Sequence, residues 1–237
     1  MGLMALLTVS SLAYADPIWV GRFEPDGTDV PAPWRVEQID KDVAPTRYRL
    51  RMWEGASAVE AHAVRSMALL ARPIEIDLAR TPVLCWRWRV DAPLEKADMT
   101  TKSGDDYAAR IYLSFDVPPE TLGLGTRLAL SLARALRGHA VPDAAINYVW
   151  DNRHPIGTWR PNAYTDRARM LVLRTGAGDA GRWVEERRDA DADFRAAFGH
   201  APARVTGLAL ASDTDNTGEE ARAGFADFRF VAREESC

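Results

Sequence analysis

The chain has 237 residues, of which 47% are hydrophobic and 27% are charged, and its formal net charge is −4. These values are ordinary for a soluble globular protein, so they exclude the disordered and fibrous classes. Thirty basic residues against thirty-four acidic ones also argue against a dedicated nucleic-acid binder, which needs a basic excess. All but three of the basic residues are Arg, a skew that we attribute mostly to the codon bias of a GC-rich genome.

The first 15 residues have the pattern of a secretory signal peptide. They carry no charge and end in a small-x-small site, Ala13-Tyr14-Ala15, so cleavage is expected after Ala15. The run is too short to cross a bilayer, which needs about 20 apolar residues. It lacks the usual initial Lys or Arg, and an apolar N-terminal strand or helix is the alternative. We therefore expect a signal peptide at 1–15, one domain at 16–237, no integral membrane segment, and a periplasmic or secreted location.

The sequence predicts a series of short β-strands. Short β-branched or aromatic runs alternate with Gly, Pro and Asp turns, a rhythm typical of an all-β, antiparallel β-sandwich such as a jelly roll. Most connections are too short for crossover helices, which favours antiparallel pairing. Within 83–90 and 108–116, apolar side chains alternate with polar ones, so one face of each strand is core and the other is polar. Strands are expected at 18–24, 34–39, 47–53, 57–65, 73–77, 83–90, 108–116, 144–150, 168–175, 182–188, 205–212 and 222–231.

Two segments interrupt this rhythm. The segment 118–138 places Leu at four-residue spacing and ends at Gly138, which predicts one inserted amphipathic helix. Such a helix packs more often on the edge of its own sandwich than on a membrane surface. The segment 189–199 has an acidic first turn and a terminal Gly, which predicts a second, short helix.

Only two cysteines are present, Cys85 and Cys237. There is no C-x-x-C or Cys/His cluster, which excludes zinc and dithiol redox sites. An oxidising compartment would permit a Cys85–Cys237 disulfide, but the strand context of Cys85 favours a buried free thiol.

The known nucleotide-binding and catalytic motifs are either missing from the sequence or lack their usual structural context. The run 176–181 matches G-x-G-x-x-G, but the residues after it predict a returning strand rather than a helix, so a glycine-rich hairpin loop is the better interpretation. No P-loop, H-E-x-x-H or G-x-S-x-G occurs, and the four His are scattered. Nothing points to a Ser/His/Asp triad.

The segment 213–219 (DTDNTGE) resembles the start of a calcium loop, because oxygen side chains alternate and a Gly follows. The twelfth position, where a helix-flanked loop needs a bidentate Glu, is Gly224. A polar turn held by Asx hydrogen bonds is the favoured interpretation, and a metal-free ligand loop is a third. For the calcium alternative the ligands are Asp213, Asp215, Thr217 and Glu219.

A second polar cluster, Lys102-Ser103-Gly104-Asp105-Asp106-Tyr107, leads into Arg110. Paired carboxylates act on glycosidic bonds when they lie about 5–10 Å apart. Asp105 and Asp106 are adjacent and therefore point apart, so a catalytic pair would need Asp213 or Asp215 as well. The favoured interpretation is a structural salt bridge between Asp106 and Arg110.

These two motifs occur together with Trp86–Val90 (WRWRV), Asn147–Asp151 (NYVWD) and Pro161–Arg167 (PNAYTDR). In this order they resemble the bacterial family known as domain of unknown function 3047, over about residues 23–230. The resemblance implies an exported protein whose sandwich is similar to galactose-binding or lectin-like jelly rolls. It implies no activity and no catalytic residue.

The leading functional hypothesis is a non-catalytic module that binds an envelope or extracellular glycan, an acidic one if the arginines contact it. Trp150, Trp159 and Tyr164, near Asn147 and Asn162, would supply stacking surfaces and amides, whereas the favoured alternative is that these aromatics pack in the core or in loops. One alternative is a glycoside hydrolase or polysaccharide lyase using Asp105 and Asp106 with Asp213 and Asp215. Another is a structural envelope protein that docks through the 118–138 helix. The candidate ligand-binding residues are Arg87, Arg89, Lys102, Asp105, Asp106, Arg110, Tyr112, Asn147, Trp150 and Tyr164.

Overall fold

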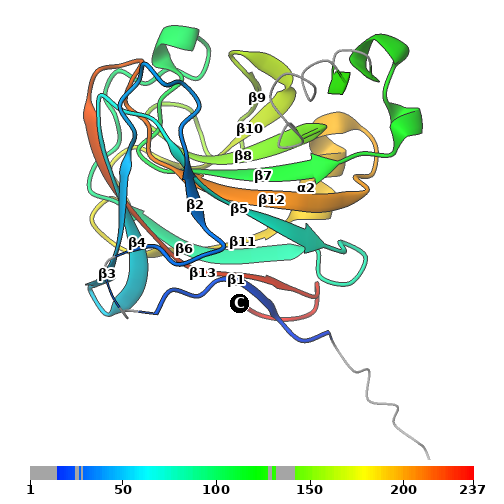
Figure 1. Ribbon diagram of the computed structural model, residues 1–237, viewed down its shortest axis with the longest axis horizontal. Helices are drawn as coiled ribbons and strands as arrows, with labels where there is room; N and C mark the ends of the chain where they lie inside the picture. The colour runs from blue at the N-terminus through cyan, green and yellow to red at the C-terminus, as the bar shows by residue number, and fades with distance from the viewer. Residues whose placement is uncertain (1–14, 25–26, 28, 128–129, 132–141) are drawn as a thin grey trace, which may run out of the picture.

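Two β-sheets pack against each other in the computed structural model, which describes residues 15–24, 27, 29–127, 130–131 and 142–237 (Figure 1). The six-stranded sheet has the order β11 (Val184–Asp189), β6 (Val83–Val90), β13 (Glu220–Val231), β4 (Ala56–Val64) and β3 (Arg47–Trp53), and β1 (Ile18–Gly21) pairs with β13. The seven-stranded sheet has the order β2 (Arg35–Glu37), β5 (Leu69–Ile76), β12 (Arg204–Ala211), β7 (Arg110–Asp116), β8 (Ala144–Asp151), β10 (Thr165–Thr175) and β9 (Trp159–Asn162).

The all-β sandwich predicted from the sequence is confirmed. The ladders are antiparallel apart from β8 and β10, which run parallel. Strand β9 was not predicted, because it has four residues and contains a Pro, which sequence rules place at sheet edges. It is indeed an edge strand, paired with β10 alone in the sheet order.

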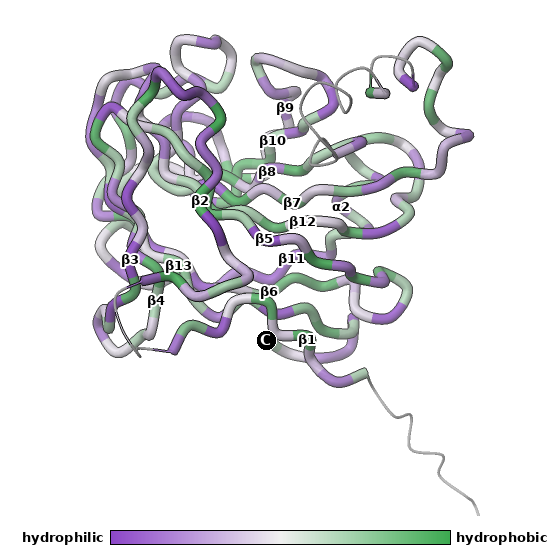
Figure 2. Tube along the Cα trace, viewed as in Figure 1, coloured by the Kyte–Doolittle hydropathy of each residue, from purple (hydrophilic) through white to green (hydrophobic). Residues whose placement is uncertain are grey.

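The core lies between the sheets and is built by the alternation within each strand. Figure 2 shows hydrophobic and hydrophilic segments alternating along both sheets. On β6, Trp86 stacks on Tyr148 of β8 at 5.4 Å between ring centroids, and Trp88 packs on Trp150 at 5.7 Å. Each fully buried Trp removes about 200 Å² from water, which contributes on the order of 5 kcal/mol before entropic costs. Trp150, expected at a loop-proximal stacking surface, is therefore a core residue.

The short helix is confirmed as α2 (Ala190–Phe198). The Asp189 side chain caps it by accepting from the Ala192 amide, and Gly199 ends it in the left-handed region. Phe194 anchors it to the core, with its ring 4.7 Å from that of Phe115.

The longer predicted helix, 118–138, falls partly outside the described residues. It is preceded by a 3-10 turn, η2 (Pro119–Thr121), and residues 124–127 and 130–131 are helical. Among the described residues no helix has the length and apolarity needed to cross a membrane.

The prediction of a free thiol was wrong. Cys85 on β6 and Cys237 form a disulfide, with 152 residues between them in sequence and 5.8 Å between their Cα atoms. The alternation on β6 that buries Trp86 turns Cys85 to the opposite face, where it lies beside Val83 and Val231. The C-terminus returns to this face and covers it, which sequence patterns alone do not indicate.

The run 176–181 also differs from its expected form. It joins β10 of one sheet to β11 of the other, so it is a crossing turn rather than a hairpin. No helix follows it, and a dinucleotide site is excluded here because the phosphate-binding helix N-terminus is missing between 176 and 189.

Candidate functional site

A groove of about 1570 Å³ lies on the face of the seven-stranded sheet that points away from the core. Its floor comes from alternate residues of the central strands. On β7, Ile111, Leu113 and Phe115 point into the core, whereas Arg110, Tyr112 and Ser114 line the groove. The predicted polar face of this strand is thus confirmed, because alternation on a pleated sheet places every second side chain on the same side.

The two Asp-rich loops meet at one end of the groove, on Arg110. The Arg110 guanidinium donates through Nη1 to Asp213 Oδ2 at 2.8 Å, and its Nη2 lies 3.4 Å from Asp105 Oδ2. All three side chains are buried and line the groove. Arg110 also stacks on Tyr112, with Cζ 4.7 Å from the ring centroid, which fixes the guanidinium plane. We call Arg110, Asp105 and Asp213 the ion cluster.

Asp106 points away from its neighbour, as expected for adjacent residues. Its carboxylate accepts from Asn216 Nδ2 at 3.1 Å and from the backbone amide of Thr217 at 2.6 Å. The predicted Asp106–Arg110 salt bridge is therefore replaced by an Asp105–Arg110 contact. Asp106 instead holds the 213–219 turn against the 102–107 loop, which brings Asp215 and Asn216 into the wall of the groove.

Two of the carboxyls in the 213–219 turn, those of Asp213 and Asp215, have raised pKa values. Burial raises the pKa of the Asp213 carboxyl well above its usual value, and the charges of Asp106, Asp105 and Asp215 raise it further against the opposing effect of Arg110. Burial and the neighbouring Asp106 also raise the pKa of Asp215. Like charges held close in a low-dielectric wall disfavour full ionisation, which is the physical reason for the raised pKa values of Asp213 and Asp215.

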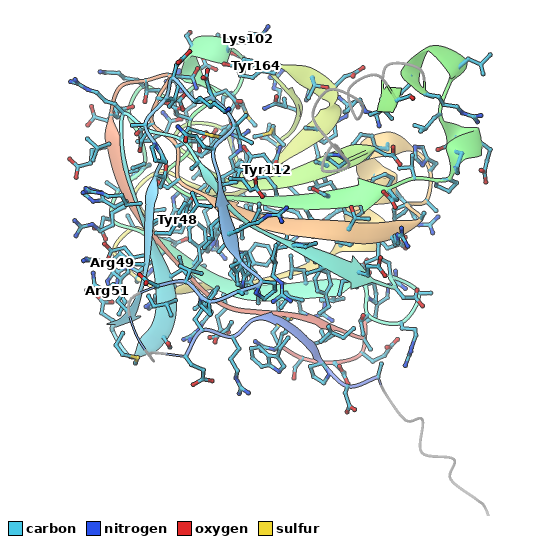
Figure 3. The ribbon with its side chains drawn as sticks, in the orientation of Figure 1. Tyr48, Arg49, Arg51, Lys102, Tyr112 and Tyr164 are labelled. Atoms are coloured by element: carbon cyan, nitrogen blue, oxygen red, sulfur yellow. A yellow bond between two sulfur atoms is a disulfide. The ribbon has the colours of Figure 1, made fainter. Side chains whose placement is uncertain are left out.

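Tyr164 and three Asn side chains complete this end of the groove. The Tyr164 hydroxyl lies 3.2 Å from the carbonyl of Lys102 and 3.1 Å from Asn216 Oδ1, while the ammonium of Lys102 lies over its ring at 5.2 Å. Figure 3 shows Lys102 and Tyr164 together at the top of the molecule, with Tyr112 lower on the sheet. Asn162 donates to Asp105 Oδ2 at 2.9 Å, and the buried Asn147 donates to the sulfur of Met170.

Three predicted ligand-binding residues lie elsewhere. Arg87 and Arg89 share a polar face with each other but not with Arg110, because β6 and β7 belong to different sheets. Arg89 is buried on the outer face of the six-stranded sheet, over the ring of Trp53 at 4.3 Å, and Arg87 pairs with Asp227. Trp150 is the core residue described above. Alternation along a strand predicts which residues share a face, but not which sheet the strand joins.

The sequence also missed part of the groove. Residues of β2 and β12, such as Arg35 and Arg204, line it, as does Asn216. Asn216 stands inside the predicted calcium motif, so its polar turn was a usable signal. Among the described residues, eight acidic side chains and four arginines line the groove, so this part of the lining is acidic.

The four predicted calcium ligands do not converge. Asp213 pairs with Arg110, whereas Glu219 accepts from the backbone amides of Glu95 and Lys96 at 3.0 and 3.1 Å. Across the described residues no group of three or more His, Cys, Asp or Glu side chains is placed to hold a metal ion.

A bound calcium ion would raise the melting temperature of the protein, and EDTA would remove that increase. Because the candidate ligands do not converge, we expect EDTA to leave the melting temperature unchanged within about 1 °C. The measurement is a thermal melt with EDTA and with millimolar calcium. A calcium-dependent rise of several degrees would restore the metal-loop interpretation.

The model of the family described as "Protein of unknown function (DUF3047)" matches residues 32–229. The chain belongs to this family. None of the curated proteins matches it significantly.

Among solved structures, the chain is similar to the family 30 carbohydrate-binding module of a Clostridium thermocellum cellulosomal cellulase, at 9% identity and TM-score 0.40, covering 94% of this chain and 96% of that one. It is also similar to the xyloglucanase domain of a Sinorhizobium fredii effector in complex with cellobiose, at 10% identity, TM-score 0.41 and coverage of 94% and 100%. A third similar structure is the endo-1,4-beta-glucanase CelB2, at 13% identity and TM-score 0.44, with coverage of 92% of this chain and 99% of that one. Superpositions this loose carry no assignment of ligand or activity to this DUF3047 chain.

Proposed function

We propose that this DUF3047 protein binds a glycan chain in the groove of its seven-stranded sheet. The observation that carries the proposal is a wall of buried polar side chains with unused hydrogen-bonding capacity. Among the described residues, Asp105 Oδ1, Asp213 Oδ1, Asp215 Oδ1 and Asn147 Oδ1 are buried oxygens with no hydrogen-bond partner, and all four side chains line the groove. Buried polar atoms are normally paired, so a concentration of unpaired ones favours a hydroxyl-rich ligand.

The shape and chemistry of the groove agree with that class of ligand. A groove that runs across several strands accommodates a linear chain, and the exposed ring of Tyr164 at its end offers an apolar face for a sugar ring. Acceptor oxygens of Asp and Asn pair with sugar hydroxyls, which donate. Because acidic residues outnumber arginines in the lining, a neutral or amine-bearing glycan fits better than the acidic one expected from the arginine content.

The test is a panel of neutral, amine-bearing and uronate-bearing oligosaccharides, followed by titration calorimetry with the best binder. Tyr164→Ala is expected to weaken binding about tenfold, since one aromatic contact contributes about 1 kcal/mol or more. Trp19→Ala is the matched control, because Trp19 is also an exposed aromatic, at 39% against 57% for Tyr164, but lies on the other sheet. Equal losses for both variants, or no binding by the wild type to any neutral or amine-bearing glycan, would refute the proposal.

A second candidate is glycoside hydrolysis, favoured by the convergence of carboxylates from two distant loops. Asp215, whose pKa is raised, would act as the general acid and protonate the leaving oxygen as the glycosidic C–O bond breaks. Asp105 would act as the base and take the proton from the attacking water, whose oxygen forms the new bond to the anomeric carbon. Binding without turnover ranks first because Asp105 and Asp213 are buried and paired with Arg110.

Measuring the products released from each bound glycan distinguishes binding without turnover from hydrolysis. If the protein hydrolyses the chain, Asp215→Asn should lower the rate about 10²–10⁴-fold while leaving binding within about twofold. Asp116→Asn is the control, since Asp116 lines the groove but pairs with exposed Arg204. Absence of reducing ends after prolonged incubation with a bound glycan would rule out the hydrolase.

We also propose that the protein works outside the reducing cytosol. The Cys85–Cys237 disulfide supports this, because such bonds persist mainly in exported proteins. Fractionation of cells expressing the full chain, with thiol alkylation before lysis, tests it. Recovery of the alkylated, reduced protein in the cytosol would contradict export.

A further inference from the structure

The outer face of the six-stranded sheet carries a row of arginines far from the groove. Strand β3 alternates, so Tyr48 and Leu50 turn toward the core while Arg47, Arg49 and Arg51 turn outward. Strand geometry separates these alternate Cα atoms by about 6.6–6.8 Å. Figure 3 shows Arg49 and Arg51 at the edge of the molecule on β3, well away from Tyr112, Tyr164 and Lys102.

A single buried carboxylate holds two of these arginines, Arg49 and Arg51. Glu60 of β4, only 2% exposed, accepts from Arg49 Nη2 at 3.0 Å and from Arg51, and Arg222 Nε of β13 lies 3.8 Å from it. Burial alone would raise the pKa of Glu60, but the hydrogen bond from Arg51 and the charges of Arg49, Arg51 and Arg222 together hold it below its usual value. Three guanidinium groups thus share one negative charge, which leaves excess positive charge on this face.

The arginines keep donors for a ligand. A guanidinium has five N–H donors, and the contact with Glu60 uses one nitrogen each of Arg49 and Arg51. Arg51 lies over the ring of Trp53 at 4.6 Å, which holds its plane. Arg47 contacts His62 Nδ1 at 3.1 Å, and His62 in turn contacts the exposed Glu220.

Edge strands often carry charge to prevent pairing with other chains, and β3 is an edge strand. Scattered, mobile charges of either sign serve that purpose. Protection of an edge does not require like-charged guanidinium groups in one row, nor the fixed orientation that Glu60 gives to Arg49 and Arg51.

We propose that the arginine row, formed by Arg47, Arg49, Arg51 and Arg222, binds a linear carboxylate-bearing polymer such as an acidic polysaccharide. Guanidinium groups match carboxylates in a planar, two-bond geometry. Arg47, Arg49 and Arg51 follow one another along β3, and Arg222 lies beside them across β4, so the donors form a narrow strip, which favours a chain over a lipid surface. This site does not depend on the groove, whose acidic lining would repel the same polymer.

The test uses polygalacturonate as the probe, fully methyl-esterified polygalacturonate as its uncharged counterpart, and anionic phospholipid vesicles. We expect the wild type to bind polygalacturonate, with affinity falling steeply between 50 and 200 mM salt because exposed charges are screened. The double variant Arg47→Gln/Arg49→Gln should lose at least about tenfold in affinity. It leaves Arg51 and Arg222 on Glu60, so folding is retained and is checked by an unchanged melting temperature.

Arg35→Gln is the control for the loss of an exposed arginine in the double variant. The side chains of Arg35 and Arg49 are 63% and 59% exposed, but they lie on different sheets. Arg35→Gln and Tyr164→Ala should leave polygalacturonate binding unchanged, which separates this proposal from that for the groove. Equal binding of the esterified polymer, full binding by the double variant, or binding to vesicles without binding to polygalacturonate would each overturn the proposal.

Discussion

Arg110→Met is expected to destabilise the protein by about 3–5 kcal/mol at pH 7, because it leaves Asp105 and Asp213 buried without their cation. Burial already raises the pKa of the Asp213 carboxyl, and loss of the Arg110 charge, which opposes that effect, raises it further above the unfolded value. A carboxyl with a raised folded pKa contributes stability that is present below the unfolded pKa and lost as pH rises through the folded pKa. The deficit of the variant should therefore be small near pH 4 and largest at neutral pH.

Urea unfolding of wild type and variant at pH 4.5 and pH 7.5 measures this difference. Arg204→Met is the control, because Arg204 also lines the groove but forms half-exposed bridges to Asp116 and Glu75 that contribute at most about 1 kcal/mol. A deficit of Arg110→Met that is the same at both pH values would show that packing of the arginine stem, rather than its charge, is what stabilises the fold.

Cys237→Ser is expected to lower the stability by about 2–5 kcal/mol, because the disulfide closes a loop of most of the chain and restricts the unfolded state. Cys237 is exposed, so the substitution removes the cross-link without placing a hydroxyl in the interior. Cys85→Ser should cost more, since Cys85 is buried beside Val83 and Val231 and the new hydroxyl would lie among them.

Chemical denaturation with and without a reductant gives the comparison. Reduced wild type should match Cys237→Ser, and the reductant should leave the variant unaffected. If Cys237→Ser and the oxidised wild type unfold at the same denaturant concentration, the cross-link has no role in stability.

Much of the local structure could be predicted from the sequence, because it depends on neighbouring residues. Alternation on 83–90 and 110–116 gave the buried face of β6 and β7, and an acidic start with a terminal Gly gave α2. The polar segments around Asp105 and Asp213 were named as candidate sites, although a structural turn was the favoured interpretation of 213–219. The same reasoning failed for Trp150, whose position near a strand end hid the fact that its ring points between the sheets.

The fold class, the strand faces and the two Asp-rich loops could be read from the chain, since these follow from local periodicity and turn chemistry. Which of these features meet depends on how the sheets pack. Arg110 and Asp213 are 103 residues apart and Cys85 and Cys237 are 152 apart, and no pattern along the chain encodes either contact. Arg87 and Arg89 lie on one face of the molecule and Arg110 on the other, because β6 and β7 belong to different sheets. Alternation determines which side of a strand a residue occupies, whereas the packing of the whole core determines which sheet the strand joins.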